Sequence, residues 1–247
     1  MIICFQYSFS QGGDPEFYKD PIEEIDYSLK YGIFKIGDAH IEFGYDQNCR
    51  GAFIQAYAKS TGLLRLIKDI HFQYDCCMDT LTGLPVTDSR ILIQGDHVDT
   101  STVYYDHVTR EDSSLVYSIN TDTVVVPKNI YDLLSGFYHY REECLEDGLP
   151  LNHSDTTTTF FIDEIWDLII RYFGKEIIDT DYGSIECLKV KPVTIIGRYF
   201  RTTEAMTMWF TNNNKQIPVK FLIELRLGTL YGNITTYKYR GNNIVIN

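Results

Sequence analysis

The sequence predicts an all-β fold: a large antiparallel curved sheet or barrel, covered by one amphipathic helix. Apolar and polar residues alternate with a period of two along most of the 247 residues, as in strands with one buried face. Turn-forming residues separate these runs without helices between them, which favours an antiparallel sheet. One segment instead repeats its apolar residues every three or four positions, which predicts the helix.

Predicted strands fill the first half of the chain. Ile25, Tyr27 and Leu29 alternate with polar residues and form the first of them. A segment rich in turn formers at 79–85 predicts a connection between two strands, and the dipeptide at 95–96 predicts a hairpin. The other elements expected here are strands at 33–36, 39–45, 53–58, 71–78, 91–94, 102–108, 115–119 and 123–126, and a helical turn at 63–67.

The amphipathic helix is predicted over residues 129–147. Asn129 is the expected N-cap, and Asp132 falls in the first turn, where the helix dipole favours a negative charge. Gly148 and Pro150 follow the segment and are expected to end it. The apolar stripe consists of Ile130, Leu133, Leu134, Phe137, Tyr138 and Leu145.

Strands resume after the helix. Turn formers at 181–184 and 212–215 predict two hairpin loops. With at least a dozen strands expected in the chain, curling or closing the sheet would remove its exposed edges. The strands expected in this half are 158–163, 167–173, 175–180, 185–194, 199–203, 205–210, 216–226 and 231–239.

The composition excludes several classes of protein. Hydrophobic residues make up 44% of the chain and charged residues 23%, which excludes a disordered chain and a coiled coil. There are 22 Lys and Arg against 34 Asp and Glu, a formal charge of −12, which argues against nucleic acid or an anionic membrane surface as a partner. No apolar run approaches the about 18 residues that a membrane-spanning helix needs, so no integral membrane span is expected.

Residues 1–13 are interpreted as the remnant of an export signal, followed by a single all-β domain over 14–247. The first five residues are apolar, and the small residues Ser8 and Ser10 behind them resemble a signal-peptidase site. The apolar stretch is short and lacks a basic region, so the signal would start upstream of the first residue. The alternative is a disordered N-terminus on a protein that is not exported.

Six cysteines leave the disulfide pattern open. None has C-x-x-C spacing, which excludes a zinc ribbon or a thioredoxin motif, and loss of Cys4 with the leader would leave an odd number. Cys76 and Cys77 are neighbours on an expected strand and would point to opposite faces. Most of the cysteines are expected to be small buried hydrophobes, with one disulfide allowed and its pairing undetermined.

Several segments occur in an order that is typical of one protein family. They are YGIFKIGDA at 31–39, DTLTGLP at 79–85, DLLSGFY at 132–138, CLKVKP at 187–192, GRYF at 197–200, MWFT at 208–211, IPV at 217–219 and LG at 227–228. Over roughly residues 20–240 the chain resembles domain-of-unknown-function family 3108, a group of bacterial envelope proteins with an export signal and an all-β body. One departure is Cys76-Cys77, where the family is expected to have small polar residues.

The resemblance implies an all-β fold and a location in the periplasm or outer cell envelope of a Gram-negative bacterium. It implies no catalytic residue, because none is established for the family, and it implies no cofactor. The resemblance therefore supports fold and compartment, and any functional hypothesis has to come from the residues themselves.

Arg198 and Arg201 are the first candidate binding residues. Their forked guanidinium groups could hold the carboxylate or phosphate of an anionic head group. The alternative, which we favour, is a surface ion pair between Arg201 and Glu204, three residues further on, which contributes little to stability.

Two further groups of titratable residues are candidates that we set aside. Acid–histidine pairs at 96–99 and 106–107 could bind a divalent metal, but their spacing matches no zinc signature. Asp163, Glu164 and Asp167 could serve as paired carboxylates in glycoside hydrolysis, but Asp163-Glu164 is interpreted as a turn between strands. We therefore predict neither catalytic residues nor a bound metal.

The aromatic content carries the functional hypothesis, because the chain holds 19 Tyr, 14 Phe and 2 Trp. These side chains either fill the barrel or line a cavity for an apolar ligand. We expect a non-enzymatic envelope protein that binds an apolar or amphiphilic ligand, such as a lipid, on the concave face of the sheet. Phe137, Tyr138 and Trp209 are the expected ligand contacts, with Arg198 at a head group.

Two alternative functions stay open. The first is a structural or protein-interaction module of the envelope without an internal ligand; a filled core with an exposed apolar patch would favour it. The second is a hydrolase that acts on envelope polysaccharide; clustered carboxylates with shifted pKa values in a polar cleft would favour it.

Overall fold

Fifteen strands form one antiparallel sheet in the computed structural model, which describes residues 19–49, 51–67, 69–119, 122–194, 200 and 202–246. The predicted leader remnant at 1–13 lies outside these residues. The strands of the first half are β1 (Lys19–Tyr31), β2 (Phe34–Asp46), β3 (Gly51–Ser60), β4 (Ile70–Met78), β5 (Pro85–Gln94), β6 (His97–Asp106), β7 (Ser113–Ser118) and β8 (Val124–Pro127). Those of the second half are β9 (Ser154–Phe161), β10 (Glu164–Thr180), β11 (Gly183–Pro192), β12 (Met206–Thr211), β13 (Pro218–Glu224), β14 (Thr229–Tyr239) and β15 (Asn242–Asn243).

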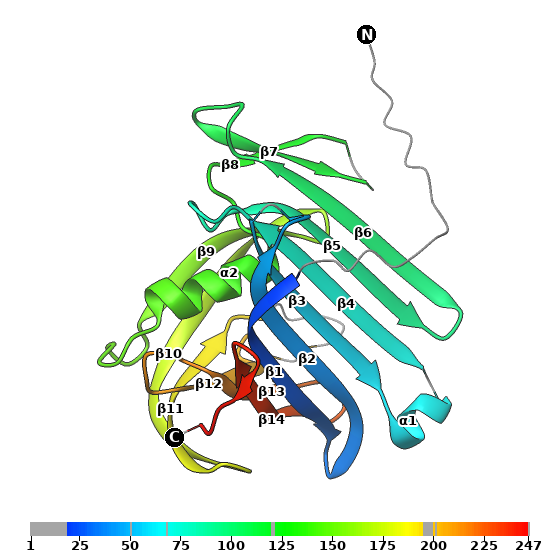
Figure 1. The fold of residues 1–247 in the computed structure, drawn as a ribbon, viewed down its shortest axis with the longest axis vertical. Helices are drawn as coiled ribbons and strands as arrows, with labels where there is room; N and C mark the ends of the chain where they lie inside the picture. The colour runs from blue at the N-terminus through cyan, green and yellow to red at the C-terminus, as the bar shows by residue number, and fades with distance from the viewer. Residues whose placement is uncertain are drawn as a thin grey trace.

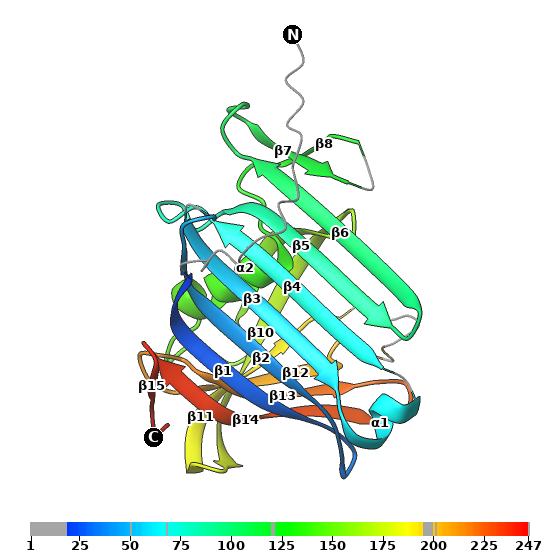
Figure 2. The ribbon, with the colours of Figure 1, turned by 45° about the vertical axis from the view of Figure 1, so that its right-hand side comes forward.

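Strand β1 joins two meanders into this sheet. The strand order is β8-β7-β6-β5-β4-β3-β2-β1-β14-β13-β12-β11-β10-β9, with β15 paired to β14. On one side β1 pairs with its neighbour in sequence, β2, and on the other with β14, from the opposite end of the chain. Figures 1 and 2 show the two meanders curling toward each other. The predicted fold class is confirmed as an all-β, nearly closed antiparallel barrel.

Bulges help the sheet to curl, because an extra residue bends a strand and increases its twist. The pairing of β1 with β14 shifts register between Asp26 and Tyr27. The pairing of β10 with β11 shifts between Tyr172 and Lys175, where Gly174 has a φ of +90°. The strands predicted separately on either side of Gly174 are therefore one long strand, β10, and the prediction of a break there was wrong.

The helix begins later than predicted, at Leu133. Asn129, the expected N-cap, has a left-handed φ of 58°, and the backbone of Tyr131 exchanges hydrogen bonds of 3.0 and 2.7 Å with β9. This part of the chain is therefore held by the sheet and cannot be helical. Asp132, expected in the first turn, is the N-cap instead, and it accepts hydrogen bonds from the first backbone amides of the helix.

The helix also ends earlier than predicted. It comprises α2 (Leu133–His139) and a π-helical turn, η1 (Tyr140–Cys144), 12 residues in all. Leu145 is extended and caps the turn through its amide, which donates to the Tyr140 carbonyl at 2.9 Å, so the helix stops before Gly148 and Pro150. A short helix, α1 (Gly62–Ile67), confirms the helical turn predicted at 63–67.

Helix α2 lies on the concave side of the sheet, between its two halves, as Figures 1 and 2 show. Leu133 and Phe137 pack against the buried side chains of β10, β11 and β12. Leu134 and Tyr138 pack against those of β3 and β4 and against Phe43 of β2. Each pair is four residues apart and so shares one face of the helix. The helix therefore occupies part of the concave face and holds the two meanders together.

Phe160 of β9 brings the two edges of the sheet close to closure. Its side chain is buried with Val103 and Tyr105 of β6 and Val116 of β7. The Tyr105 hydroxyl also reaches the Phe160 carbonyl at 3.4 Å. Side chains thus join β9 to the other end of the sheet, although β8 and β9 remain the two edges of the strand order.

Candidate functional site

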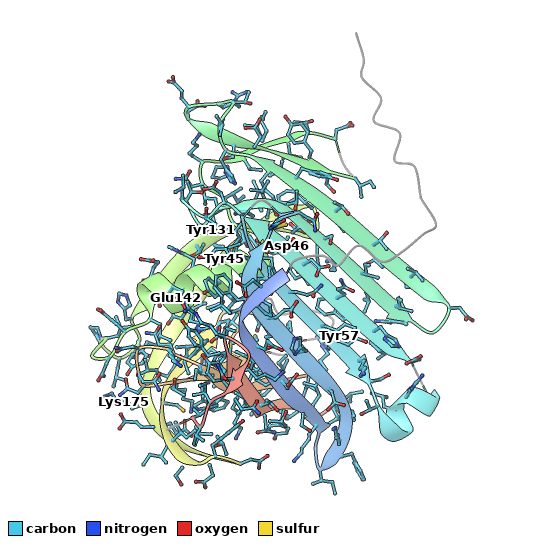
Figure 3. The ribbon with its side chains drawn as sticks, in the orientation of Figure 1. Tyr45, Asp46, Tyr57, Tyr131, Glu142 and Lys175 are labelled. Atoms are coloured by element: carbon cyan, nitrogen blue, oxygen red, sulfur yellow. A yellow bond between two sulfur atoms is a disulfide. The ribbon has the colours of Figure 1, made fainter. Side chains whose placement is uncertain are left out.

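A groove of about 450 Å³ runs along one side of the helix. We call it the helix groove. Its walls are the helix, the ends of β2, β3 and β4, and the turn between β4 and β5. The residues that line it are Phe43, Tyr45, Ala52, Met78, Asp79, Thr80, Leu81, Thr82, Gly83, Tyr131, Ser135, Tyr138, His139, Glu142 and Glu143. Figure 3 shows Tyr45, Tyr131 and Glu142 close to α2.

The residues that the helix contributes to the groove lie on one face of the helix because of their spacing in the sequence. Ser135, Tyr138 and Glu142 follow one another at intervals of three and four residues, which places them on one face. That face is turned toward β2 to β4, whereas Leu133 and Phe137 belong to the face that packs on β10 to β12. The polar side of the helix thus forms one wall of the groove.

Aromatic rings form much of the groove surface. The Tyr138 ring stacks on Phe43 of β2, with 4.4 Å between centroids and 23° between planes. The Tyr131 ring stacks on His139, with 4.8 Å between centroids and 20° between planes. Tyr45 adds a third tyrosine, which is 49% exposed. These rings offer flat apolar surface with polar edges, which suits ligands that are part apolar and part polar.

The opposite wall is a turn built around Asp79. Its carboxylate accepts hydrogen bonds from the backbone amides of Leu81 and Thr82, at 3.0 and 2.9 Å, and from the Thr82 hydroxyl at 3.0 Å. These bonds to the charged form lower the pKa of Asp79, so it is ionised at neutral pH. The turn predicted at 79–85 is confirmed, and it presents a fixed negative charge to the groove.

Two further carboxylates, Glu142 and Glu143, line the groove from the π-helical turn η1, and both are exposed. Partial burial raises the pKa of Glu142, while the guanidinium of Arg141 opposes the shift; the two side chains are 3.5 Å apart. With Asp79, the groove therefore carries three carboxylates around aromatic surface.

A buried ion pair anchors the C-terminal part of the helix. The Arg141 guanidinium donates to both carboxylate oxygens of Glu23 in β1, at 2.6 and 2.8 Å, and to the Lys215 carbonyl at 2.7 Å. Both side chains are buried, which makes the pair costly to break. Arg141 also lies over the Tyr138 ring, 5.6 Å from its centroid, so the anchor supports the groove wall directly.

A buried polar cluster anchors the N-terminal end of the helix. Asp132 is fully buried, and its carboxylate accepts hydrogen bonds from the Leu134 amide at 2.8 Å, the Cys76 thiol at 2.9 Å and the Ser135 hydroxyl. Asp88 lies opposite Cys76 in the β4–β5 pairing. Two carboxyl groups therefore flank one thiol inside the barrel.

Asp88 is the carboxyl group of this cluster whose pKa is raised. Burial, followed by the nearby Asp132 charge, raises its pKa to about 8, although the Tyr105 hydroxyl donates to it at 2.6 Å and Arg90 opposes the shift. Asp163 is a further negative charge that acts on it. Asp88 therefore keeps its proton when the folded protein is at neutral pH.

Stability should fall as pH rises because of Asp88. Its folded pKa lies above its unfolded value, so from about pH 4 to pH 8 the folded chain holds a proton that the unfolded chain has released. We expect a loss of about 3 kcal/mol in the free energy of unfolding between pH 5 and pH 7 that Asp88→Asn removes. Urea unfolding of both proteins at the two pH values measures this, with exposed Asp112→Asn as the control. Equal pH slopes for wild type and Asp88→Asn would contradict it.

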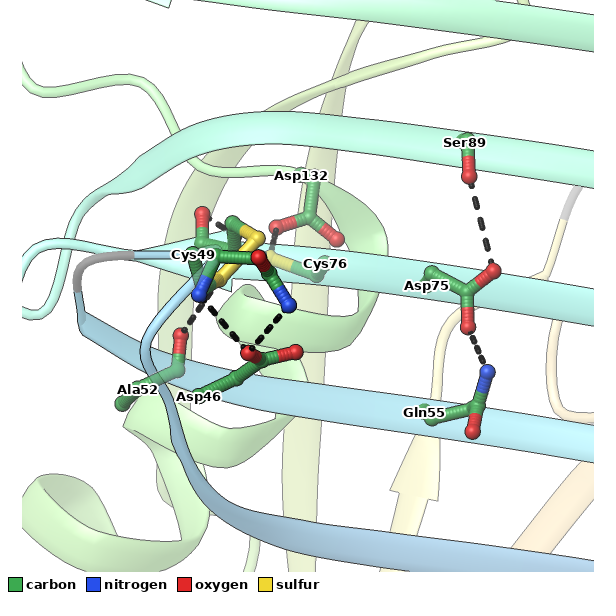
Figure 4. The surroundings of a disulfide bond; sticks show 10 residues. Asp46, Cys49, Ala52, Gln55, Asp75, Cys76, Ser89 and Asp132 are labelled. Carbon is green, nitrogen blue, oxygen red and sulfur yellow. Dashed lines mark hydrogen bonds between the residues drawn. A yellow bond between two sulfur atoms is a disulfide. The ribbon is translucent and has the colours of Figure 1, made fainter. Parts of the chain in front are cut away.

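A disulfide joins Cys49 and Cys77, with 5.5 Å between their Cα atoms (Figure 4). It connects the β2–β3 loop to the end of β4. Figure 4 also shows Cys76 directed to Asp132, on the other side of the strand from the disulfide. The predicted opposite orientation of Cys76 and Cys77 is confirmed, and the pairing that the sequence left open is Cys49 with Cys77.

The structure separates the residues that the sequence analysis grouped as ligand contacts. Tyr138 lines the helix groove, but Phe137 points to the other side of the helix, into the packing against β10 to β12. Trp209 is buried in a different cluster, with the aliphatic residues Ile217 and Val219. Arg198 lies outside the described residues.

Charged side chains surround the indole of Trp209. Its Nε1 donates to Glu176 at 3.1 Å, and the amines of Lys189 and Lys220 lie 5.6 and 5.3 Å from the ring centroid. These partners hold the ring in place at the surface of its cluster. A ligand contact at Trp209 stays a prediction, at a place separate from the helix groove.

Two of the other titratable candidates, Glu204 and His107, have structural partners. Glu204 pairs with Arg171 and Lys191, each at 3.4 Å, while Arg201 lies outside the described residues.

His107 contacts the Ser114 hydroxyl at 2.9 Å and the Pro85 carbonyl at 3.0 Å, and burial lowers its pKa. In the described part of the chain, no group of three or more His, Cys, Asp or Glu is placed to hold a metal ion.

The turn interpretation of the carboxylates after β9 is confirmed. Ile162 and Asp163 both have left-handed φ, 52° and 58°, and form the two-residue turn between β9 and β10. The Asp163 carboxylate accepts a hydrogen bond of 2.5 Å from the Ser118 hydroxyl at the end of β7. Glu164 is the first residue of β10, so the turn lies one position earlier than the Asp163-Glu164 predicted.

Sequence reasoning missed Tyr131, His139, Glu142 and Glu143. It followed the apolar stripe of the helix, which includes Tyr138 but none of these four residues. For Glu142 a signal was present, because it follows Tyr138 at helical spacing, whereas Tyr131 lies before the helix. The partner wall on β2 to β4 left no comparable signal, since its residues come from separate strand ends.

The comparisons with known proteins agree with this architecture. Among the described residues, no helix has the length and apolar character needed to cross a membrane. No curated protein matches the chain. The crystal structure titled as a β-barrel-like protein of domain of unknown function DUF1849 from Brucella abortus is similar over 90% of this chain and 99% of that one, with a TM-score of 0.55 and 9% identity. At that identity the likeness concerns the fold alone.

The sequence itself identifies the family. A family model described as a protein of unknown function, DUF3108, matches residues 26–235. This range runs from β1 into β14 and so includes both meanders, the helix and every element that forms the helix groove. The chain belongs to the DUF3108 family.

Proposed function

We propose that this protein is an exported, non-enzymatic binding protein of the cell envelope, which holds an amphiphilic ligand in the helix groove. The observation that carries the proposal is the groove itself. Its volume of about 450 Å³ is within the roughly 300–1,000 Å³ typical of small-molecule sites. Its surface combines stacked aromatic rings with a few carboxylates and hydroxyls, so it matches a ligand with an apolar part and a polar part.

The placement of the helix favours this groove over the interior of the barrel. Both sides of α2 are packed against the sheet, so the concave face that the sequence analysis assigned to the ligand is partly filled by protein side chains. The groove lies at the flank of that helix, where Tyr138 contributes its ring to the site. A ligand there would need no displacement of the core.

The disulfide supports export. Structural disulfides form in oxidising compartments such as the periplasm and are rare in the cytosol. Cys49 and Cys77 form one, whereas Cys76, Cys144 and Cys187 are free thiols. When cells that make the protein are lysed into urea, so that buried thiols can react, two cysteines should therefore resist maleimide labelling until a reductant is added. The protein should also fractionate with the periplasm or outer envelope. Complete labelling without reductant would contradict export.

Ligand binding is tested with dodecyl maltoside below its critical micelle concentration. Native mass spectrometry of the purified protein, after organic extraction, should show uptake of one detergent molecule. Tyr138→Ala should weaken this uptake by about tenfold, because it removes a large part of the apolar surface that binds the chain. Tyr57→Ala is the matched control, since Tyr57 sits on β3 with His71 as its partner and does not line the groove.

Two outcomes would contradict the proposal. The first is no uptake by the wild-type protein at any concentration below micelle formation. The second is equal loss for Tyr138→Ala and Tyr57→Ala, which would place the detergent elsewhere. Urea unfolding of both variants shows that each remains folded during the measurement.

A further inference from the structure

The charge of the helix groove points to the head group of its ligand. Asp79, Glu142 and Glu143 line the groove, and none of the described residues that line it is Lys or Arg. Arg141 lies 3.5 Å from Glu142, but it is buried behind this wall and its charge is paired with Glu23. The whole chain carries a formal charge of −12, so its overall field also attracts cations. An anionic head group would meet repulsion from both sources, whereas a cation would be attracted by both.

Aromatic rings strengthen this argument, because the face of a tyrosine attracts a cation through its negative quadrupole. The Tyr138 ring already has the Arg141 guanidinium 5.6 Å from its centroid. Tyr131 and Tyr45 line the same groove and have no cation–π partner among the contacts of the described residues. His139 covers one face of the Tyr131 ring, so an incoming ammonium group would use the other face of that ring and the Tyr45 ring.

We propose that the helix groove recognises an ammonium head group attached to an apolar chain. This rests on the proposed function and adds the chemical class of the ligand. The ammonium lies among the carboxylates of Glu142, Glu143 and Asp79 and against the Tyr131 and Tyr45 rings. The apolar chain lies along Phe43, Met78 and Tyr138.

Four probes with the same twelve-carbon chain test the proposal by isothermal titration calorimetry below micelle formation. They are dodecyltrimethylammonium, dodecylphosphocholine, dodecyl maltoside and laurate. The expected affinity for dodecyltrimethylammonium is about tenfold higher than for dodecyl maltoside, with laurate weakest. Dodecylphosphocholine carries the ammonium as phospholipids do: binding equal to that of the free cation indicates a lipid head group, and weaker binding indicates an amine.

Charge-neutralising variants locate the head group. Glu142→Gln and Glu143→Gln should each lower the affinity for dodecyltrimethylammonium by about threefold more than they lower the affinity for dodecyl maltoside. Glu146→Gln is the matched control, because Glu146 is exposed, lies three residues further on and does not line the groove. It changes the net charge equally, so it reports attraction to the protein as a whole. Tyr131→Leu, which keeps apolar volume, should lower ammonium affinity by about threefold.

The outcomes separate this inference from the function on which it rests. If dodecyl maltoside binds in the groove and dodecyltrimethylammonium binds no better, the ammonium assignment falls and the proposed function stands. If Glu146→Gln costs as much as Glu142→Gln and Glu143→Gln, the attraction is general and the assignment again falls. If no probe binds, both proposals fall.

Discussion

Glu23→Gln is expected to lower the free energy of unfolding by about 3–5 kcal/mol, because it removes the buried charge partner of Arg141 and leaves that guanidinium with only the exposed Glu142 nearby. Arg141 is 9% exposed and Glu23 is 6% exposed, so water cannot replace the lost carboxylate. Of the two hydrogen bonds, 2.6 and 2.8 Å long, glutamine can keep at most one, because its amide has a single acceptor oxygen. Urea unfolding followed by circular dichroism measures the change.

The control for this prediction is an ion pair at the surface. Lys175→Gln breaks the bond between Lys175 and Asp147, whose atoms are 2.7 Å apart but exposed, and should change stability by less than about 1 kcal/mol. Adding Arg141→Met to Glu23→Gln should recover part of the loss, since it removes the unpaired charge. A loss below 1 kcal/mol for Glu23→Gln would show that the pair does not hold the helix.

Cys49→Ser combined with Cys77→Ser is expected to lower the free energy of unfolding by about 3.5 kcal/mol, the loop-closure effect for cysteines separated by 28 residues. The bond limits the conformations of the unfolded chain, and in the folded protein it fixes the β2–β3 loop to the end of β4. Because Ala52 and Met78 of these elements line the helix groove, the same double variant should also weaken detergent uptake.

Reduction offers an independent version of this experiment. Wild-type protein unfolded in urea with dithiothreitol should have the stability of the double variant, and the double variant should not respond to the reductant. Cys144→Ser, at a free and partly exposed cysteine, is the control and should change little. A response of the double variant as large as that of the wild type would show that another bond is responsible.

Local sequence patterns were sufficient to predict the sheet. Alternation along Ile25, Tyr27 and Leu29 predicts a strand with one buried face, and β1 buries Ile25 and Tyr27. The turn at 79–85 was predicted because Asp79 can bond the backbone that follows it. These features depend on neighbours within a few residues, so the sequence contains what is needed to recognise them.

Features that depend on distant partners were not predictable in the same way. Ile130 belongs to the apolar stripe of the predicted helix, yet the pairing of its neighbour Tyr131 with β9 removes this segment from the helix. Arg141 and Glu23 are 118 residues apart, and neither carries a local sign of its partner. The candidate site was predicted in part, because Tyr138 was identified from the helix but the strands opposite it are defined only by the folded sheet.

The place of β1 in the sheet has a consequence for the order of folding. Glu23 pairs with Tyr239, so one edge of β1 finds its partner only when nearly the entire chain is available. Contacts between such distant segments form slowly, because a long loop must close before they contribute. Until β14 arrives, β1 presents unpaired amides and carbonyls that can pair with another chain. The risk of aggregation is therefore greatest for molecules that have made β1 to β13 and not yet β14.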